Sequence, residues 1–493
     1  MDNYQNGEIE ELKEVTYKPV DHDSRSQELK PSSTRKTDTF FLYFSVLTVN
    51  LSMVVNGSFL VWTSPVIPQL QSINPEINPL GEKITTFQIS TLVGLPSLFS
   101  IFGSLFFGKL PDVIGRRKTL ICISLGILLS NIAVAFGRHI YLYYAGRSIT
   151  NLCLGLLFVV VPIYLNEICE DHNRAKFTCL MMSFVPFGSL YGYLLGPITN
   201  IKVFTLLCVA PLIPQLIFLW LLIPETPVYA ASKGDKGGTM EILKKFRSNK
   251  TDYEIQEDYN QIEAMLKANA RTQQRGLKNI FETRALRKGF LIGMGCCLST
   301  YMSGVPIIMG FLGPIFNDAG TNLSGNMVAI LVGCVKLLFF FVTITIVERF
   351  GRRPLLLLSS FGTAIPLAVL AVYFYLKSSH SPIIADIRWL PVACILFYIA
   401  LYSLGLGSIA FFLLTEFFPN DLRSLATSLV MTIVNVFLLI MTTGFPIVSD
   451  FMGVHYCIGI FSISCIFSFI FMYFFLPETK GKSFLEIQEI LSR

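Results

Sequence analysis

Charged residues are scarce in this sequence, and their scarcity excludes an ordinary soluble domain. Asp, Glu, Lys and Arg make up 15% of the 493 residues, and 52% are hydrophobic. Soluble domains carry about 25% charged residues, because water-facing side chains must cover the core. We therefore expect most of the chain to lie in lipid and to form one large membrane bundle rather than several globular domains.

Groups that carry catalysis or bind metals are also few. The five histidines lie in the tail, in loops or at a span end, and the 11 cysteines include no Cys-x-x-Cys pair. The sequence has no phosphate-binding loop, no metal cluster and no nucleophile beside a base. These absences argue against an enzyme and against a proton relay through histidine. We predict no cofactor, no metal and no nucleic-acid partner.

Long apolar windows are what the sequence has instead. A membrane helix needs about 20 apolar residues. Such windows lie at 40–66, 86–107, 119–136, 145–165, 177–197 and 203–223, and again at 289–313, 326–347, 354–376, 389–414, 425–448 and 454–476. Only helices satisfy their own backbone in lipid, and no alternating strands of a barrel occur. The predicted fold class is an all-α membrane protein with twelve transmembrane helices in two six-helix bundles.

The positions of Lys and Arg predict the orientation. If both termini are cytoplasmic, 32 of the 39 Lys and Arg residues fall in cytoplasmic segments. The runs EILKKF and YNQIEAMLKANA predict helices in the central loop. Asn322 begins an Asn-Leu-Ser sequon in an outside loop and is the candidate glycosylation site. The predicted parts are a tail (1–39), a first bundle (40–228), a helical cytoplasmic loop (229–288), a second bundle (289–477) and a cytoplasmic segment (478–493).

Three motifs occur twice, once in each half of the chain. They are GKLPDVIGRRK at 108–118 with VERFGRRPL at 347–355, Glu167 and Arg174 with Glu416 and Arg423, and PETP at 224–227 with PETK at 477–480. In both acid and arginine pairs of the second motif the spacing is seven residues. Three motifs repeated in the same order indicate that the halves are pseudo-symmetric copies of one six-helix unit.

The repeated charges have two possible explanations. They can act only as anchors of the positive-inside rule, with Gly115 and Gly351 forming tight turns. Alternatively, acids and arginines at neighbouring helix ends pair and hold one face of the molecule closed. The repetition favours the second explanation, and it predicts a transporter whose halves rock about a central site by alternating access.

With these motifs the chain resembles the sugar porter branch of the major facilitator superfamily, from about residue 40 to 485. The strings GRSITN, PIYLNEIC, TEFFPNDLR and PETKGKS also carry the resemblance, and WTSPVIPQL at 62–70 is similar to insect facilitated trehalose transporters. The resemblance implies transport of a small polar solute, by default trehalose or a hexose. It also implies a multi-pass plasma-membrane protein with both termini cytoplasmic, and we expect a monomer. Because no carboxylate is available inside the predicted spans, we expect facilitated diffusion rather than proton symport.

The resemblance further implies a network of gating salt bridges at the cytoplasmic face. Arg147 matches the fourth-span arginine of the family, although snorkelling to the outer interface is the ordinary explanation for its position. Glu225 and Glu478 are expected to cap the network against the intracellular helices. The predicted members are Asp112, Arg116, Arg147, Glu167, Arg174, Glu225, Glu348, Arg352, Glu416, Arg423 and Glu478.

The sugar site departs from the family pattern. Family members bind sugar hydroxyls with paired amides in the seventh span, where this chain has Thr300 and Tyr301. The fifth-span glutamine is replaced by Met182. Polar residues in such spans often only bond between helices, so both roles stay open. The candidate substrate contacts are Met182, Thr300, Tyr301, Lys336, Ser403, Phe411 and Asn435.

Lys336 adds a charge where the family usually has asparagine. It lies near the middle of the eighth span, where a charge costs at least about 2.5 kcal/mol. A neutral lysine, an ammonium bound by carbonyls and water, and a cation that meets an anionic substrate group all remain open. The substituted site leaves two alternative functions open: transport of a non-sugar or anionic solute, and a membrane solute sensor that does not transport.

Overall fold

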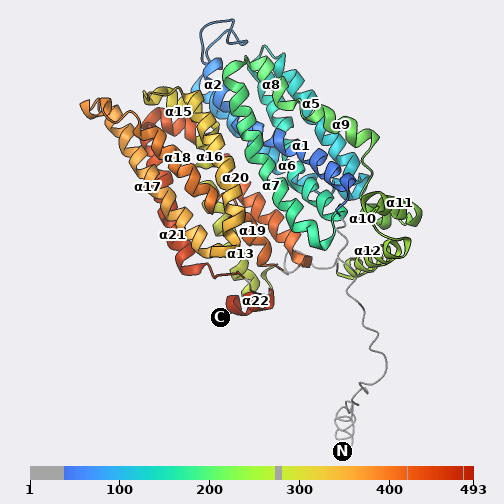
Figure 1. Ribbon diagram of the computed structural model, residues 1–493. Coiled ribbons are helices and arrows are strands. Elements are labelled where there is room, and N and C mark those ends of the chain that lie inside the picture. Colours follow the sequence, from blue (N-terminus) through green and yellow to red (C-terminus); the bar gives the residue numbers. More distant parts are fainter. Residues whose placement is uncertain (1–37, 273–279, 419, 481, 483, 493) are drawn as a thin grey trace, which may run out of the picture. The chain divides into compact units, whose positions relative to one another are not determined.

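The computed structural model describes residues 38–272, 280–418, 420–480, 482 and 484–492. The regular secondary structure of these residues is helical throughout (Figure 1). Twelve of the described helical segments are long and apolar enough to cross a membrane. The predicted twelve spans are confirmed. Of the predicted tail, all but Asp38 and Thr39 lies outside the described residues.

The first six spans are formed by single helices or by helices in series. Asn200 starts the sixth span as an N-cap whose side chain accepts from the Val203 N–H, and this span is interrupted at Ala210 and Pro211, between α8 and α9. The elements are α1 (Phe40–Val61), α2 (Thr63–Leu70), α3 (Thr86–Phe106), α4 (Leu110–Ile114), α5 (Arg116–Ala135), α6 (Ile140–Ile168), α7 (Asp171–Leu195), η1 (Gly196–Ile198), α8 (Ile201–Val209) and α9 (Leu212–Leu221).

Three helices follow before the second half begins: α10 (Pro227–Ser232), α11 (Lys236–Phe246) and α12 (Asp252–Thr272). They confirm the helices predicted for the central loop. The second half contains α13 (Arg284–Met302), α14 (Val305–Gly310), α15 (Leu312–Ala319), α16 (Gly325–Phe350), α17 (Arg352–Ser378), η3 (Pro382–Ala385), α18 (Leu390–Leu404), α19 (Ile409–Glu416), α20 (Asn420–Met452), α21 (Val454–Phe475) and α22 (Phe484–Ser492).

Two spans of the second half are broken where the sequence predicted continuous windows. The seventh breaks at Gly304, whose φ of 81° lies in the left-handed region, and Pro306 then stands in the first turn of α14. The tenth breaks between α18 and α19, at residues 405–408. Discontinuous helices are tolerated at membrane depth where they lie inside the protein, so these breaks mark the interior of the second half.

Close contacts without bulky side chains hold the helices of the first half together. Gly57 of α1 and Gly188 of α7 face each other's backbones, and an added Cβ would lie 2.1 Å from the Val185 oxygen or 2.0 Å from the Val54 oxygen. Small residues that let helix backbones approach are typical of membrane bundles. Helix α3 also packs on α6, and in the second half α17 packs on α18 and α21.

The two ends of the helices differ. At one end, called the motif end, lie α10, α11, α12 and α22 (Figure 1). The repeated Gly-Arg-Arg turns belong to this end, because a Cβ on Gly115 would contact Tyr229 of α10, and one on Gly351 would contact Glu478, which precedes α22. At the other, called the opposite end, lie α2 and α15. The halves contact each other through α3 and α20, α7 and α16, α2 and α15, and α1 and α14.

Candidate functional site

The turn before α5 is fixed by a carboxylate from the end of the sixth span. Gly115 is the N-cap of α5 with a φ of 102°, and the free N–H groups of Arg116 and Arg117 both donate to Glu225, at 3.0 Å. A carboxylate at a helix N-terminus also meets the positive end of the helix dipole. Glu225 therefore caps the third span rather than one of the linker helices.

The Arg116 side chain links three segments of the first half at the motif end. Its guanidinium lies 2.9 Å from Asp112 and 2.9 Å from Glu167 of α6. Glu167 also accepts a hydrogen bond from the Thr226 hydroxyl, and the Tyr229 ring lies 5.3 Å from the guanidinium carbon. The Arg116 and Glu167 side chains are only 11% and 13% exposed, so this is a half-dry, charge-assisted network.

The second half repeats this arrangement. Gly351 has a φ of 90°, and the N–H groups of Arg352 and Arg353 donate to Glu478 at 3.1 and 3.0 Å. Arg352 lies 3.3 Å from Glu416 of α19. Corresponding residues therefore pair in the same way in each half. Each of these ion pairs joins elements of the same half.

The second arginine of each repeated turn has a role that the sequence analysis missed. Arg117 donates to the carbonyl oxygens of Leu219 and Trp220, at 2.7 and 2.6 Å, near the end of α9. Arg353 donates to the Tyr473 oxygen, at 2.7 Å, near the end of α21. Free carbonyls at a helix C-terminus favour a cation. The repeat of two adjacent arginines in both turns was the feature of the sequence that could have predicted these contacts.

The remaining predicted gating residues are placed differently. Arg174 is exposed near the start of α7. The side chains of Glu348 and Arg423 lie outside the described part of the chain. Asn322, the candidate glycosylation site, is exposed between α15 and α16.

Arg147 lies inside the first half, away from the motif-end network. It is 5% exposed, and its guanidinium carbon lies 4.6 Å from the Trp62 ring centre and 5.9 Å from that of Phe59. Its Nε and Nη1 atoms have no hydrogen-bond partner among the described residues. The Trp62 indole donates to Thr205 at 3.1 Å. Aromatic faces thus stabilise this cation, and the part played by Trp62 had no signal in the sequence.

The opposite end is closed by hydrogen bonds between the halves. The Thr63 hydroxyl donates to the Gly310 oxygen at 2.7 Å, and the Gly313 N–H donates to the Ser64 hydroxyl at 2.9 Å. Gly313 has no room for a Cβ, which would lie 2.6 Å from the Ser64 oxygen. These contacts join α2 of the first half to α14 and α15 of the second.

Further hydrogen bonds join the halves. The Tyr193 hydroxyl of α7 donates to the Met309 oxygen at 2.7 Å. The Ser90 hydroxyl of α3 donates to the Thr443 oxygen of α20, and Thr86 donates to Asp450 at 3.0 Å. A backbone carbonyl is the acceptor in the first two of these bonds, so the contact depends little on side chains of the second half.

The predicted substrate contacts gather only in part. Tyr301 and Phe411 form an edge-to-face pair with ring centres 6.3 Å apart, across the breaks of the seventh and tenth spans. Thr300 is buried, and its hydroxyl donates at 2.8 Å to the oxygen of Leu406, in the break of the tenth span, so this bond joins two spans. Ser403 is 4% exposed, and its hydroxyl has no hydrogen-bond partner among the described residues. Met182 is 39% exposed.

Lys336 and Asn435 complete the predicted set. The Lys336 ammonium lies 3.0 Å from the Met309 sulfur, so the side chain points toward α14. A thioether is a weak acceptor and meets only one of the three ammonium N–H groups. Asn435 is half-buried in α20.

A charge cluster attaches the linker helices to the start of α7. Lys250 lies 2.8 Å from Glu170 and 2.9 Å from Asp258, and Arg247 lies 3.3 Å from Glu170. Burial lowers the pKa of Lys250, but hydrogen bonds to the two carboxylates outweigh it, and the net pKa is raised. No sequence motif predicted this cluster, because its members come from segments that are distant in the sequence.

Asp38 attaches the segment before α1 to the same region. Its carboxylate accepts from the Asn173 amide at 2.8 Å and from Lys176 at 3.1 Å. Burial alone would raise the pKa of Asp38, but the bonds from Asn173, Lys176 and Tyr43 outweigh it and lower the pKa to about 2.

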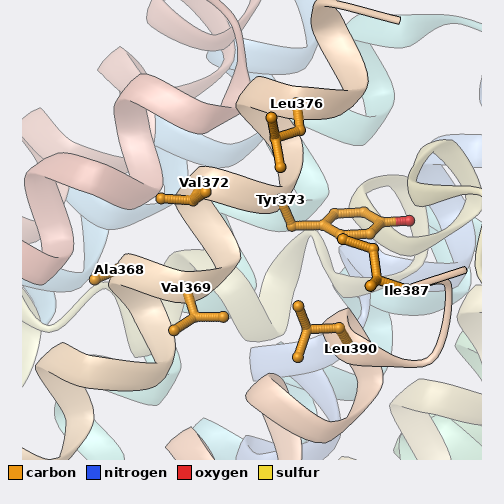
Figure 2. A pocket seen from close by; sticks show the side chains of 7 residues that line it. All are labelled: Ala368, Val369, Val372, Tyr373, Leu376, Ile387 and Leu390. Carbon is orange, nitrogen blue, oxygen red and sulfur yellow. The ribbon is translucent and has the colours of Figure 1, made fainter. Parts of the chain in front are cut away.

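A surface pocket of about 250 Å³ between α17 and α18 is unsuited to a polar solute. Its lining, shown in Figure 2, consists of Ala368, Val369, Val372, Tyr373, Leu376, Ile387 and Leu390. The only side-chain polar atom in this lining, the Tyr373 hydroxyl, already donates to the Ala319 oxygen at 3.1 Å. The pocket offers nothing that would recognise hydroxyl groups.

Two six-helix halves with a duplicated motif at one end define a membrane transporter of the major facilitator fold. The profile of the family described as "Sugar (and other) transporter" matches residues 14–491. The chain belongs to this family, whose members are transporters and not enzymes.

Individual relatives and solved structures agree with the family. The chain is 28% identical over 470 residues to a facilitated trehalose transporter Tret1-2 homolog of Drosophila sechellia, covering 94% of this chain and 93% of that protein. It is 28% identical over 458 residues to the facilitated trehalose transporter Tret1 of Polypedilum vanderplanki, covering 92% and 89%. The inward open conformation of the xylose transporter XylE from E. coli has a TM-score of 0.75 at 20% identity, covering 91% of this chain and 99% of that one, and shows the same fold.

Proposed function

We propose that this protein is a facilitative sugar transporter of the plasma membrane that works by alternating access. The observation that carries the proposal is the duplicated motif, which gives each half its own ion pair and its own capped turn at the same end. Two matched, internally braced halves suit a rocking motion about a central site. Because the relatives are named as trehalose transporters, the solute class that we propose is trehalose or a hexose.

The proposed orientation places the motif end in the cytoplasm. The excess of Lys and Arg in the segments at this end follows the positive-inside rule. Both termini are then cytoplasmic, the opposite end faces outward, and Asn322 is available for glycosylation. Under this orientation the hydrogen bonds between Thr63 and Gly310 and between Ser64 and Gly313 form an outer gate that is closed in this structure.

The proposed role of the motif-end charges follows from their connections. Arg116 with Glu167, and Arg352 with Glu416, each hold helices of one half together. Each half can then move as a unit, while the gate between the halves consists of hydrogen bonds worth about 1 kcal/mol each. Bonds of this size can be broken during each cycle. We retain Asp112, Glu225 and Glu478 as parts of the bracing, with Arg174, Glu348 and Arg423 as proposed members.

The proposed solute site lies beside the broken seventh and tenth spans. Tyr301 and Phe411 offer aromatic surface, and Ser403, Lys336 and Asn435 offer polar groups. Met182 and Thr300 are retained as peripheral members of the site. In the spans that the structure describes, Asp and Glu occur only near the ends, at Glu167 and Asp450. This distribution favours uncoupled diffusion over proton symport.

Uptake and counterflow in proteoliposomes test the proposal. We expect saturable uptake of labelled trehalose or glucose that does not change when the pH gradient is collapsed. Preloading with unlabelled sugar should accelerate uptake of the labelled sugar. Sugar binding without counterflow would instead support the sensor alternative, which the family match does not favour.

Lys336→Ala separates the remaining alternatives. If the solute is a neutral sugar, saturable sugar uptake should persist in this variant. If the solute is anionic, labelled organic acids should be taken up by the wild type and lost in the variant. The second result would overturn the sugar proposal.

A further inference from the structure

A tight turn between α11 and α12 presents a serine between two cations. The Lys250 N–H donates to the Arg247 oxygen at 3.0 Å, which closes a turn with Ser248 and Asn249 at its tip. Ser248 is exposed. Exposed turn tips are the segments most accessible to modifying enzymes.

The two ends of this turn are held by the charge cluster of Glu170, Arg247, Lys250 and Asp258. Arg247 pairs with Asp258 as well as with Glu170, and Lys250 pairs with the same two carboxylates. The four side chains are between 11% and 18% exposed. Through Glu170, the cluster fastens the linker helices to the start of the fifth span.

A second contact fastens the same turn to the start of α1. The Thr39 hydroxyl donates to the Phe246 oxygen at 2.8 Å, and the Phe41 and Phe246 rings lie 5.3 Å apart. The end of α11 therefore touches both α1 and α7 of the first half. A charge added at this turn would act on the attachment of the whole linker.

The residues before Ser248 are basic. The sequence reads Lys244-Lys245-Phe246-Arg247-Ser248, and both lysines are exposed. An exposed serine that follows several cations suits a kinase whose peptide groove is acidic, since the cations and the groove attract each other. The neighbouring Thr251 is less suited, because its hydroxyl donates to Glu254 at 2.9 Å in the capping of α12.

We propose that Ser248 is a phosphorylation site for a basophilic serine kinase, and that its phosphorylation loosens the linker helices from the first half. The Ser248 oxygen attacks the γ-phosphorus of ATP, the bond from that phosphorus to ADP breaks, and the serine proton passes to the kinase base or to water. The proposal rests on the cytoplasmic orientation proposed above, because ATP and the kinase are on that side.

The electrostatics of the turn explain the loosening. A phosphoserine carries a charge of about −1.5 to −2 and three acceptor oxygens. Placed between Arg247 and Lys250, it competes with Glu170 and Asp258 for the same two cations and repels both carboxylates. Carboxylates that lose their cations in a partly dry site favour separation and hydration.

Phosphorylation of the solubilised full-length protein tests the site without regard to orientation. A basophilic kinase with labelled ATP should label the wild type, and peptide mass spectrometry should place the phosphate on Ser248. Ser248→Ala should lose most of the label, and Thr251→Ala should retain it. Labelling that is unchanged in Ser248→Ala, or no labelling of the wild type, would overturn the proposal.

Hydrogen exchange tests the mechanical consequence. Phosphorylated protein should exchange the amides of α11 and α12 several-fold faster than unphosphorylated protein, with α22 unchanged as an internal control. Glu170→Gln without phosphate should give a similar increase, and phosphorylation of that variant should add little. Equal exchange before and after phosphorylation would contradict the release.

Sealed vesicles separate this inference from the proposed function. Kinase and ATP added to inside-out vesicles should label Ser248, whereas right-side-out vesicles should stay unlabelled. The reverse pattern would overturn the orientation and, with it, the proposal for the cell. Sugar uptake is scored separately, so a protein that is phosphorylated but does not transport sugar refutes only the proposed function.

Discussion

The two copies of the motif-end network have the same plan but differ in the length and exposure of the arginine–glutamate ion pair. In the first half, Arg116 lies 2.9 Å from both Asp112 and Glu167, and Thr226 donates to Glu167. In the second half, Arg352 lies 3.3 Å from Glu416. The corresponding Thr479 hydroxyl is buried without a hydrogen-bond partner among the described residues.

The duplication therefore preserved which residues pair, but not the length and burial of the ion pair that they form. The backbone caps are nearly identical in both halves, since Glu225 and Glu478 accept from the same two N–H groups. The arginine–glutamate pair is shorter and less exposed in the first half, at 2.9 Å against 3.3 Å. We infer that the second half is the more easily distorted of the two at the motif end.

Removing the acid of each pair should have the largest effect. Glu167→Gln leaves a nearly buried arginine with one carboxylate and should cost about 3 kcal/mol, because uncompensated buried charge is expensive. Glu416→Gln should cost about 1 kcal/mol, since its pair is longer and more exposed. Thermal unfolding of the purified variants measures both. Equal losses, or a larger loss for Glu416→Gln, would contradict the comparison.

Replacing the glycine of each turn should have the next largest effect. Gly115→Ala places a Cβ 2.4 Å from the Glu225 oxygen, and Gly351→Ala places one 2.8 Å from the Glu478 oxygen. Both also force alanine into a positive φ, which costs roughly 1 to 3 kcal/mol. We expect both variants to melt below the wild type. Gly115→Ala should have the lower melting temperature of the two.

Gly444→Ala is the matched control for the glycine pair, because no atom lies within 4 Å of its added Cβ. It should melt at or slightly above the temperature of the wild type, since alanine favours a helix interior. A control that melts as low as Gly115→Ala would show that the turns are not special.

Replacing the two threonines should give effects of opposite sign. Thr226→Val removes the hydrogen bond to Glu167 and should cost about 1.5 kcal/mol or more, because the acceptor is charged. Thr479→Val removes a buried hydroxyl that lacks a partner, so stability should stay the same or rise. Melting temperatures measured side by side decide this, and a fall for Thr479→Val would indicate that its hydroxyl is bonded after all.

The smallest expected effect is a pH-dependent change in stability. It comes from Asp38, which adds hydrogen bonds to the first half. The pKa of Asp38 is lowered from 3.8 to about 2, so its stabilisation is present above pH 3.8 and is lost as the pH falls toward 2. Asp38→Asn should therefore melt below the wild type at pH 7, and the gap should narrow between pH 4 and pH 3. A gap that is constant over this range would argue against ionised Asp38 as the anchor.

The spans and the duplication could be predicted from the sequence because both are carried by local patterns. Apolar windows report the lipid environment residue by residue, and the Gly-Arg-Arg turns repeat with their flanking acids. The pairing of Arg116 with Glu167 followed from the position of both at helix ends facing the same side. The breaks at Gly304 and at residues 405–408 were missed, because an apolar window continues through a bent helix.

Contacts between distant, unpatterned residues could not be predicted. The contact of Trp62 with Arg147 could not be predicted, because in the sequence Trp62 is one of many aromatic residues in the spans. The Glu170 cluster draws on α7, on the turn after α11 and on α12, which no spacing rule connects. The hydrogen bonds from α2 to α14 and α15 use common hydroxyls and main-chain groups, which leave no sequence signature. The candidate solute residues were found by resemblance, and the polar contacts of Thr300 and Lys336 depend on packing that only coordinates give.

The hydroxyls of Thr63, Tyr193 and Ser90 all bond to peptide oxygens of the other half. Every amino acid supplies such an oxygen, so positions 309 and 443 can change side chain while these bonds survive, whereas a Cβ at Gly310 would lie 3.1 Å from the Thr63 hydroxyl oxygen. Residues that line the cavity, and with them the solute specificity, can therefore change while the hydrogen bonds between the halves are kept. For this reason, the departures from the family's sugar-binding residues are compatible with intact hydrogen bonds between the two halves.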